Sequence, residues 1–207
     1  MIRDAFWFLI PLLMIAALCA FFGLTAAVVL WLLLAVFVAY FFRNPAREIP
    51  AGEHRVVSPA DGKVVRIVGI PDTAEEMPGG QNVSIFLNIF DVHVNRAPIG
   101  GKLERLEYRR GRFKVAYDEQ ASEVNEQNIL AIQGSGVCVV VKQIAGLIAR
   151  RVVCWKRPGY LLQRGELFGL IRFGSRVDIL VPKEIKILVR VGDRVKGGSS
   201  VIGEVMQ

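Results

Sequence analysis

Three side chains in this sequence have the types needed for a nucleophile and its general base. Ser175 follows Gly174 between two β-prone apolar segments, while His93 and Asp61 lie far upstream. A serine hydroxyl is a weak nucleophile at neutral pH, so it needs a base that removes its proton and donors that stabilise an oxyanion. A Ser-His-Asp relay is defined by geometry and not by order along the chain, so this wide spacing does not exclude one.

Each of these residues also has a purely structural interpretation. A Gly-Ser pair between strands commonly forms a turn or bulge, because glycine tolerates positive φ and serine bonds its own backbone. Asp61 precedes Gly62, which is typical of a turn aspartate. His93 is one of two histidines, and the other, His54, lies in a charged segment and is expected to be exposed. The residues alone leave the catalytic and the structural interpretations open.

The N-terminal residues 1–43 are expected to form a helical membrane hairpin. Residues 5–42 carry no charged side chain. As one helix they would extend roughly 57 Å, nearly twice the hydrocarbon thickness of a bilayer, whereas Gly23 divides them into two helices of about 27–28 Å. Arg3 and Arg43 flank the run, so the positive-inside rule predicts both ends, and the domain that follows, on the cytoplasmic side of the cell membrane. A shallow insertion that does not cross is the alternative.

After a linker at residues 44–55, residues 56–207 are expected to form one all-β sandwich or barrel. Short β-branched and aromatic runs alternate there with Gly, Pro and Asp clusters. The segment 185–203 is similar to the second half of a lipoyl/biotinyl-type sandwich. Lys183 and Lys186 lack the methionine neighbours of a carrier lysine, which argues against a carrier role.

The charge balance and the cysteine usage restrict the partners and cofactors. The formal net charge is +7 and the pI is about 9.6, which beside a membrane segment favours anionic lipid headgroups. No nucleic-acid partner is expected, because no binding module is recognisable. Three cysteines without a C-x-x-C pair predict neither a disulfide framework nor a metal site. The basic cluster Arg109, Arg110 and Arg112 either faces a lipid surface or is an ordinary solvated loop.

Four motifs together resemble the phosphatidylserine decarboxylases in their short, archaeal-type form. They occur in the family's order, and the resemblance spans residues from about 40 to 182. The motifs are Arg43-Asn44-Pro45, Ser58-Pro59-Ala60-Asp61-Gly62, Phe90-Asp91-Val92-His93-Val94-Asn95-Arg96-Ala97-Pro98, and Arg-Gly-Glu-x-Phe-Gly-x-Ile-Arg-Phe-Gly-Ser-Arg-Val-Asp at 164–178.

The resemblance implies a self-cleaving precursor. Ser175 Oγ would attack the Gly174 carbonyl to give an ester. Elimination of this ester would leave dehydroalanine, which water would hydrolyse to a pyruvoyl group at residue 175 with loss of ammonia. The products would be a large chain, 1–174, and a small chain, 175–207, that remain together as a heterodimer. The pyruvoyl group would form a Schiff base with the amine of phosphatidylserine and accept electrons as CO2 leaves, giving phosphatidylethanolamine without a metal.

The resemblance also assigns roles to three further residues. His93 and Asp61 would form the relay with Ser175, and His93 would donate the proton that follows decarboxylation. Many longer members of the family carry a second histidine where this chain has Arg96. Either His93 serves both steps, or Arg96 and Asp61 act differently. The planar guanidinium of Arg96 also suits the binding of a carboxylate or phosphate of the substrate.

Two rival functions are compatible with the same residues. One is a membrane-anchored hydrolase in which Ser175 stays intact, and the other is a non-catalytic lipid-binding or carrier-like module. Intact mass distinguishes a hydrolase, which remains one chain, from a pyruvoyl enzyme, which becomes two. Substitution of Ser175 would leave a non-catalytic module unchanged.

Overall fold

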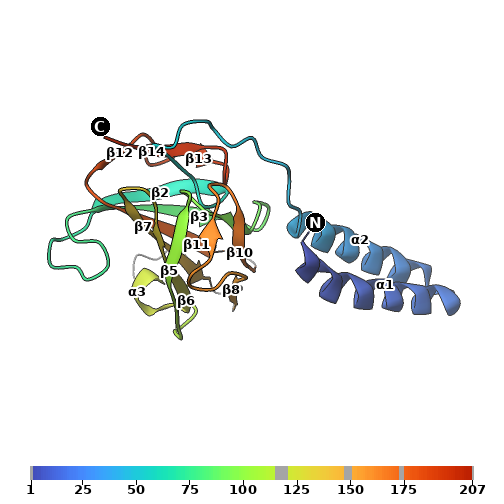
Figure 1. Cartoon of the computed structure of the whole chain (residues 1–207). Coiled ribbons are helices and arrows are strands. Elements are labelled where there is room, and N and C mark those ends of the chain that lie inside the picture. Colours follow the sequence, from blue (N-terminus) through green and yellow to red (C-terminus); the bar gives the residue numbers. More distant parts are fainter. Residues whose placement is uncertain (1, 115–120, 147–150, 173–174, 207) are drawn as a thin grey trace. The chain divides into compact units, whose positions relative to one another are not determined.

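An apolar helix pair precedes the β-rich part of the chain in the computed structural model (Figure 1), which describes residues 2–114, 121–146, 151–172 and 175–206. A 3-10 turn, η1 (Arg3–Ala5), leads into α1 (Phe6–Phe21), and α2 (Thr25–Phe41) follows. Gly23 lies between the two helices with φ of 69°, a conformation that glycine adopts without a steric penalty. The division of the apolar run at Gly23 is therefore confirmed.

The two helices pack against each other and expose much apolar surface. Phe8 stacks on Phe42, with ring centroids 5.4 Å apart, and the Ile2 N–H donates to the Phe42 carbonyl at 3.2 Å. By length and composition the helix Arg3–Phe21 could cross a membrane, and α2 is a shorter apolar helix. Large side chains such as Trp7 and Phe21 are exposed on the helices.

The chain divides into two compact units, Met1–Ala46 and Arg47–Gln207. Within the described part of the second unit, three antiparallel sheets are present, the largest in the order β13-β2-β3-β11-β7-β6-β5-β9. The strands of the large sheet are β2 (Gly62–Gly69), β3 (Gln81–Leu87), β5 (Gly101–Arg109), β6 (Gln127–Gln133), β7 (Cys138–Ala145), β9 (Leu161–Leu162), β11 (Ser175–Val181) and β13 (Arg194–Val195).

Two three-stranded sheets and a short helix complete the unit. One sheet has the order β1-β14-β12 and the other the order β4-β10-β8. The elements are β1 (Arg55–Val57), β4 (Val94–Arg96), α3 (Ala121–Val124), β8 (Val152–Cys154), β10 (Leu167–Ile171), β12 (Ile185–Ile187) and β14 (Val201–Val205).

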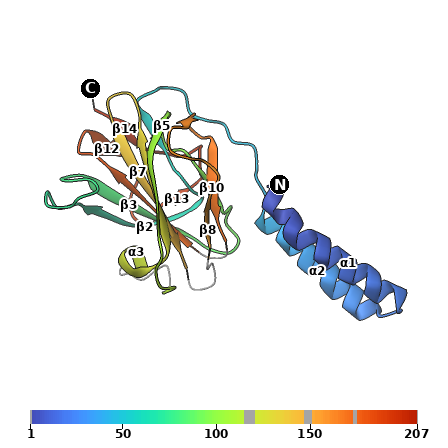
Figure 2. The ribbon, with the colours of Figure 1, turned by 60° about the horizontal axis from the view of Figure 1, so that its bottom comes forward.

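The large sheet curls into a half-barrel, as Figures 1 and 2 show. The prediction of a mainly β unit after an N-terminal helix pair is confirmed at this level. The lipoyl/biotinyl likeness of 185–203 stays a prediction. In that segment β12 pairs with β14, whereas β13 joins the large sheet beside β2.

Strand β11 lies at the centre of the large sheet and is buried along its whole length. It pairs with β3 on one side and with β7 on the other. Val177, Ile179 and Val181 point into the main hydrophobic core. Alternate residues of a strand face opposite sides of its sheet, so Arg176 and Asp178 lie on the other face.

Arg176 and Asp178 form a buried ion pair on that face. Arg176 Nε donates to Asp178 Oδ1 at 2.6 Å and Arg176 Nη2 donates to Oδ2 at 2.9 Å, while the two side chains are 2% and 1% exposed. Arg176 Nη2 also donates to Ser122 Oγ at 3.2 Å, and Asn82 Nδ2 donates to Asp178 Oδ2 at 3.4 Å. The bidentate geometry and these extra bonds offset the desolvation of two charges.

Removing one partner of this pair should strongly destabilise the β unit. We expect Asp178→Ala to lower the free energy of unfolding by about 3–5 kcal/mol, because the Arg176 charge would remain buried without compensation. Urea unfolding followed by circular dichroism measures the change, in a Ser175→Ala chain so that the predicted cleavage does not complicate the transition. Glu104→Ala, which breaks the exposed pair with Lys102, is the matched control and should cost less than about 1 kcal/mol. Equal losses in the two variants would contradict this account.

Candidate active site

Ser175 begins the central strand in a closed environment. It is fully buried, and it pairs with Leu87 of β3 and Ala145 of β7. Its Oγ has no hydrogen-bond partner among the described residues. A buried polar group without a partner costs about 1–3 kcal/mol, so the Ser175 hydroxyl calls for an explanation, as does that of Ser84 on β3, which shares this property. Gly174, the predicted partner in cleavage, lies outside the described residues.

His93 lies just before β4 and is buried. Its Nδ1 is 3.0 Å from the main-chain oxygen of Asp91. A carbonyl oxygen can only accept, so Nδ1 carries the proton and Nε2 of the neutral ring holds the lone pair. This is the tautomer that a general base needs, with its orientation fixed by a main-chain contact.

The pairing of β4 with β10 brings the histidine segment to the strand that leads to Ser175. Val94 pairs with Leu170, and the Ile171 N–H donates to the His93 carbonyl at 3.2 Å. Ile171 precedes Ser175 by four positions in the sequence. The His93 backbone is therefore fixed to the segment that ends at the predicted cleavage point, although no described residue is hydrogen-bonded to the Ser175 hydroxyl.

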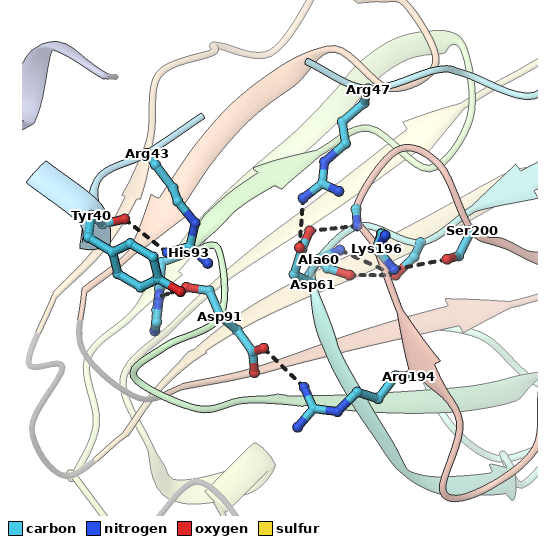
Figure 3. Close-up of polar contacts among 12 residues, drawn as sticks. Tyr40, Arg43, Arg47, Ala60, Asp61, Asp91, His93, Arg194, Lys196 and Ser200 are labelled. Carbon is cyan, nitrogen blue, oxygen red and sulfur yellow. Dashed lines mark hydrogen bonds and ion pairs between the residues drawn. The ribbon is translucent and has the colours of Figure 1, made fainter. Parts of the chain in front are cut away.

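Asp61 has partners other than His93. Its carboxylate accepts from Arg47 Nη2 at 2.7 Å (Figure 3) and also from the Gly197 N–H at 2.8 Å. Burial raises the pKa of the Asp61 carboxyl, and the bonds from Gly197 and Arg47 oppose that rise. The described structure thus places Asp61 in a cluster with Arg47 and Gly197, and the Ser-His-Asp relay stays a prediction.

Arg96 belongs to the same cluster as Asp61. The Arg96 N–H donates to the Pro59 carbonyl at 2.9 Å, and its Nη1 donates to the Gly165 carbonyl at 2.9 Å. Burial lowers the pKa of its guanidinium, and nearby Arg47 lowers the pKa further, whereas Asp61 raises it. Asp61 therefore interacts electrostatically with both Arg47 and Arg96, and also with the carboxylate of Asp91.

Sequence reasoning missed the role of Asp91. Its Oδ2 accepts from the Asn88 N–H at 2.9 Å, and its Oδ1 accepts from Arg194 Nη1 at 3.2 Å (Figure 3). The same residue orients the His93 ring through its carbonyl. Asp91 thus fixes the turn that carries His93 and connects this turn to β13. An Asn-x-x-Asp sequence before the histidine, typical of a side-chain-stabilised turn, is the signal that indicates it.

Candidate metal ligands do not gather in the described parts of the chain. Among those residues no group of three His, Cys, Asp or Glu side chains could hold a metal ion. Cys19, Cys138 and Cys154 are free cysteines. Burial raises the pKa of the Cys138 and Cys154 thiols, which disfavours the reactive thiolate.

Comparison with known proteins identifies the family. The family model described as phosphatidylserine decarboxylase matches residues 34–203. A phosphatidylserine decarboxylase proenzyme of Carboxydothermus hydrogenoformans is 43% identical over 206 residues, which cover 99% of this chain and 96% of the relative. Proenzymes of the same name from Solibacter usitatus and Syntrophus aciditrophicus are each 51% identical, over 90% and 84% of this chain and 90% and 83% of the relatives. The resemblance seen in the sequence motifs is therefore confirmed, and this chain belongs to the phosphatidylserine decarboxylase family, in its short form.

Proposed function

We propose that this protein decarboxylates phosphatidylserine to phosphatidylethanolamine and CO2, with a pyruvoyl group that it makes from its own Ser175. The observation that carries the proposal is the Ser175 hydroxyl, which is buried at the start of the central strand without a described partner. The similar proteins are named proenzymes, a name that denotes a precursor requiring processing. Ser175 is the residue whose environment suits that processing.

The surroundings of residue 175 fit a pyruvoyl group. The orphaned Oγ marks a position where an oxygen atom is tolerated in the interior, and the strand neighbours Leu87 and Ala145 are apolar and fully buried. When present, the group supplies a carbonyl that reacts with the substrate's amine and accepts the electron pair released with CO2. Apolar neighbours exclude water, which would otherwise compete in this chemistry.

His93 is proposed as the general base of self-cleavage and as the proton donor that completes decarboxylation. The bond from Nδ1–H to the Asp91 carbonyl supports this assignment, because it leaves the lone pair on Nε2. The Ile171–His93 backbone bond supports it further, since that bond ties the histidine to the segment preceding Ser175. With Arg96 at the position of a second histidine, His93 would serve both steps.

The sheet pairing supports a stable heterodimer after cleavage between 174 and 175. The proposed small chain, 175–207, contains β11, β12, β13 and β14. In the proposed large chain, 1–174, strands β3 and β7 pair with β11, β2 pairs with β13, and β1 pairs with β14. Breaking one peptide bond would leave all of these ladders intact, so the two chains would remain together.

Arg96 and Arg47 are proposed to attract the anionic headgroup of the substrate. Burial lowers the pKa of the Arg96 guanidinium most and repulsion from Arg47 lowers it further, while Arg47 also donates to the Asp61 carboxylate at 2.7 Å. An added carboxylate or phosphate would relieve that repulsion, and a guanidinium binds such groups through paired N–H donors.

The apolar helix pair is proposed to hold the enzyme at the cell membrane, with the catalytic unit on the cytoplasmic side. The exposed apolar side chains of α1 and α2 support contact with lipid. Arg3 and Arg43 flank the pair, and basic flanks favour the cytoplasmic side. Phosphatidylserine stays in the bilayer, so an anchored enzyme would meet it by lateral diffusion.

Replacing the proposed nucleophile tests the function directly. We expect Ser175→Ala to remain one chain of 207 residues without decarboxylase activity, because the variant has no hydroxyl from which a pyruvoyl group can form. Intact-mass spectrometry of the purified protein measures cleavage, and release of CO2 from phosphatidylserine vesicles measures activity. Ser84→Ala, a buried serine on the neighbouring strand β3, is the matched control and should process normally. An uncleaved but active wild type would indicate the hydrolase instead.

The titration of Asp61 should appear in the stability of the protein. Because burial raises the folded-state pKa of this acid above its ordinary value of 3.8, the folded protein binds the proton more tightly than the unfolded chain. The contribution of Asp61 to stability is therefore fully present at low pH and is lost as pH rises through the raised pKa. The two proteins to compare are Ser175→Ala and the double variant that also carries Asp61→Asn. We expect the difference in Tm, double variant minus Ser175→Ala, to increase as pH is raised from about 3.5. A difference that shrinks with rising pH would show that the Arg47 pair dominates.

Replacing Arg96 should weaken substrate binding more than chemistry. We expect Arg96→Gln to raise KM for phosphatidylserine in vesicles about tenfold with little change in kcat, because uniform binding of the headgroup would be lost. Arg157→Gln, a change at an exposed arginine, is the control for the general effect of charge on vesicle binding. A fall in kcat at unchanged KM would place Arg96 in the chemical step instead.

A further inference from the structure

Three buried carboxamides form a chain across the interior of the β unit. Asn128 Nδ2 on β6 donates to Gln143 Oε1 on β7 at 2.9 Å, and Gln143 Nε2 donates to Asn95 Oδ1 on β4 at 2.7 Å. Asn95 and Gln143 are 0% exposed. The chain connects the large sheet to the sheet β4-β10-β8. Buried polar networks of this kind are stable only when their members are satisfied, so each donor and acceptor in it has to be accounted for.

The main-chain carbonyl of Val153 determines which atom of each carboxamide donates and which accepts. Gln143 Nε2 also donates to the Val153 carbonyl at 3.3 Å. Because a carbonyl only accepts, the Gln143 atom that faces it must be the nitrogen. That nitrogen then requires an acceptor on Asn95, so Asn95 Oδ1 faces Gln143 and Asn95 Nδ2 is directed elsewhere.

Asn95 Nδ2 is left as an orphaned donor. It is buried and has no hydrogen-bond partner among the described residues, and the same holds for Ser175 Oγ. The interior of the β unit therefore contains a donor, Asn95 Nδ2, and a possible acceptor, Ser175 Oγ, neither of which has a described partner. Each alone would cost about 1–3 kcal/mol, and a hydrogen bond between them would remove both penalties.

The strand registers place Gln143, the residue that holds Asn95, close to Ser175. Ser175 pairs with Ala145 and Val177 pairs with Gln143, so Gln143 is the diagonal neighbour of Ser175 on the same face, roughly 7–8 Å away. Asn95 reaches Gln143 from the facing sheet, and its register partner on β10 is Gly169. A Cβ at Gly169 would collide with the Val153 carbonyl and lie 2.9 Å from Gln143 Nε2. Glycine at this position therefore leaves room for the carboxamides beside Ser175.

We propose that Asn95 Nδ2 donates a hydrogen bond to Ser175 Oγ during self-cleavage, and that Gln143 is the positioning residue that holds the Asn95 carboxamide in the donating orientation. The inference rests on the proposed function and extends it to two residues. The bond uses an Oγ lone pair and leaves the hydroxyl proton for His93. It also stabilises the negative charge that grows on Oγ as the proton leaves.

Every bond and proton in the self-cleavage step is accounted for by groups of the protein itself. The Ser175 hydroxyl proton moves to His93 Nε2, and Oγ bonds to the carbonyl carbon of the preceding residue. The bond from that carbon to the Ser175 nitrogen then breaks, and the nitrogen takes the proton from His93. An ester and a free amine replace the amide and the hydroxyl, and no oxidant or further reactant is needed.

Two isosteric variants test this role, because each reverses the order of donors and acceptors among the three carboxamides. Asn95→Asp replaces the proposed donor, Asn95 Nδ2, with a carboxylate oxygen. Gln143→Glu replaces the Gln143 amide nitrogen with an acceptor, so the Asn95 carboxamide should rotate by 180° and direct its nitrogen towards residue 143. We expect each to slow self-cleavage about tenfold or more at about pH 8, which corresponds to the loss of one hydrogen bond. The full-length chain is made by cell-free synthesis with lipid vesicles, and conversion to 1–174 and 175–207 is followed on gels and by intact mass.

The pH dependence separates this role from a merely structural one. The carboxyl group introduced by Asn95→Asp would be buried, so its pKa would be raised and it could donate once protonated. The cleavage rate of this variant, divided by the wild-type rate at the same pH, should therefore rise as pH falls towards about 6. Ser84→Ala is the control. Ser84 Oγ is also buried and has no partner among the described residues, but Ser84 pairs with Asp178 and so lies on the opposite face of the sheet. This variant should cleave at the wild-type rate.

Several outcomes would overturn the inference. Wild-type rates and pH profiles in both variants, with Tm values confirming that they are folded, would exclude the Asn95 bond. An equal slowing in Ser84→Ala would show a general effect on packing instead. If Asn95→Asp does not fold, Gln143→Glu decides alone. A wild-type chain that never cleaves would overturn the proposed function itself, whereas a cleaving wild type with unaffected variants would overturn only the role of Asn95.

Discussion

The pairing of β11 between β3 and β7 is the constraint on which the rest of the structure depends. Both edges of this strand are hydrogen-bonded and both faces are buried, so its first residue, Ser175, is held in the interior. A buried hydroxyl without a described partner lowers the stability of the fold. The same burial keeps solvent from competing for the hydroxyl, which the proposed role as a nucleophile requires. The same ladders would keep the strand in place after the proposed cut, as our proposal requires of a position that is first a nucleophile and then the site of a pyruvoyl group.

The sheet β4-β10-β8 carries the groups that we propose to act on this position. It carries His93 and Asn95 on or beside β4, and β10 runs from that pairing towards Ser175. The histidine is oriented by a main-chain carbonyl, and the carboxamide of Asn95 is oriented by Gln143. Backbone carbonyls have fixed polarity and position, so they set which nitrogen of each side chain donates. Pre-oriented groups of this kind need little reorganisation when charge develops.

Asp61 has contacts that tie together distant parts of the β unit, and its place in a Ser-His-Asp relay stays a prediction. It joins Arg47, at the start of the β unit, to Gly197 in the C-terminal segment. Asp91 acts in a similar way, since it connects the His93 turn to Arg194. Each carboxylate thus joins a residue before the proposed cut to a residue after it. These contacts would supplement the strand ladders in holding the two proposed chains together.

The sequence by itself determined the family, the β character of residues 56–207 and the helix pair divided at Gly23, and it pointed to Ser175 as the proposed nucleophile. These follow from local patterns, because β-branched runs, glycine conformations and contiguous motifs are properties of neighbouring residues. Only the tertiary structure decided which partners Asp61, Asp91 and Arg96 have, and that Asn95 and Gln143 meet beside Ser175. Those contacts join positions up to 136 residues apart, and their geometry depends on strand register and sheet packing, which no local pattern specifies.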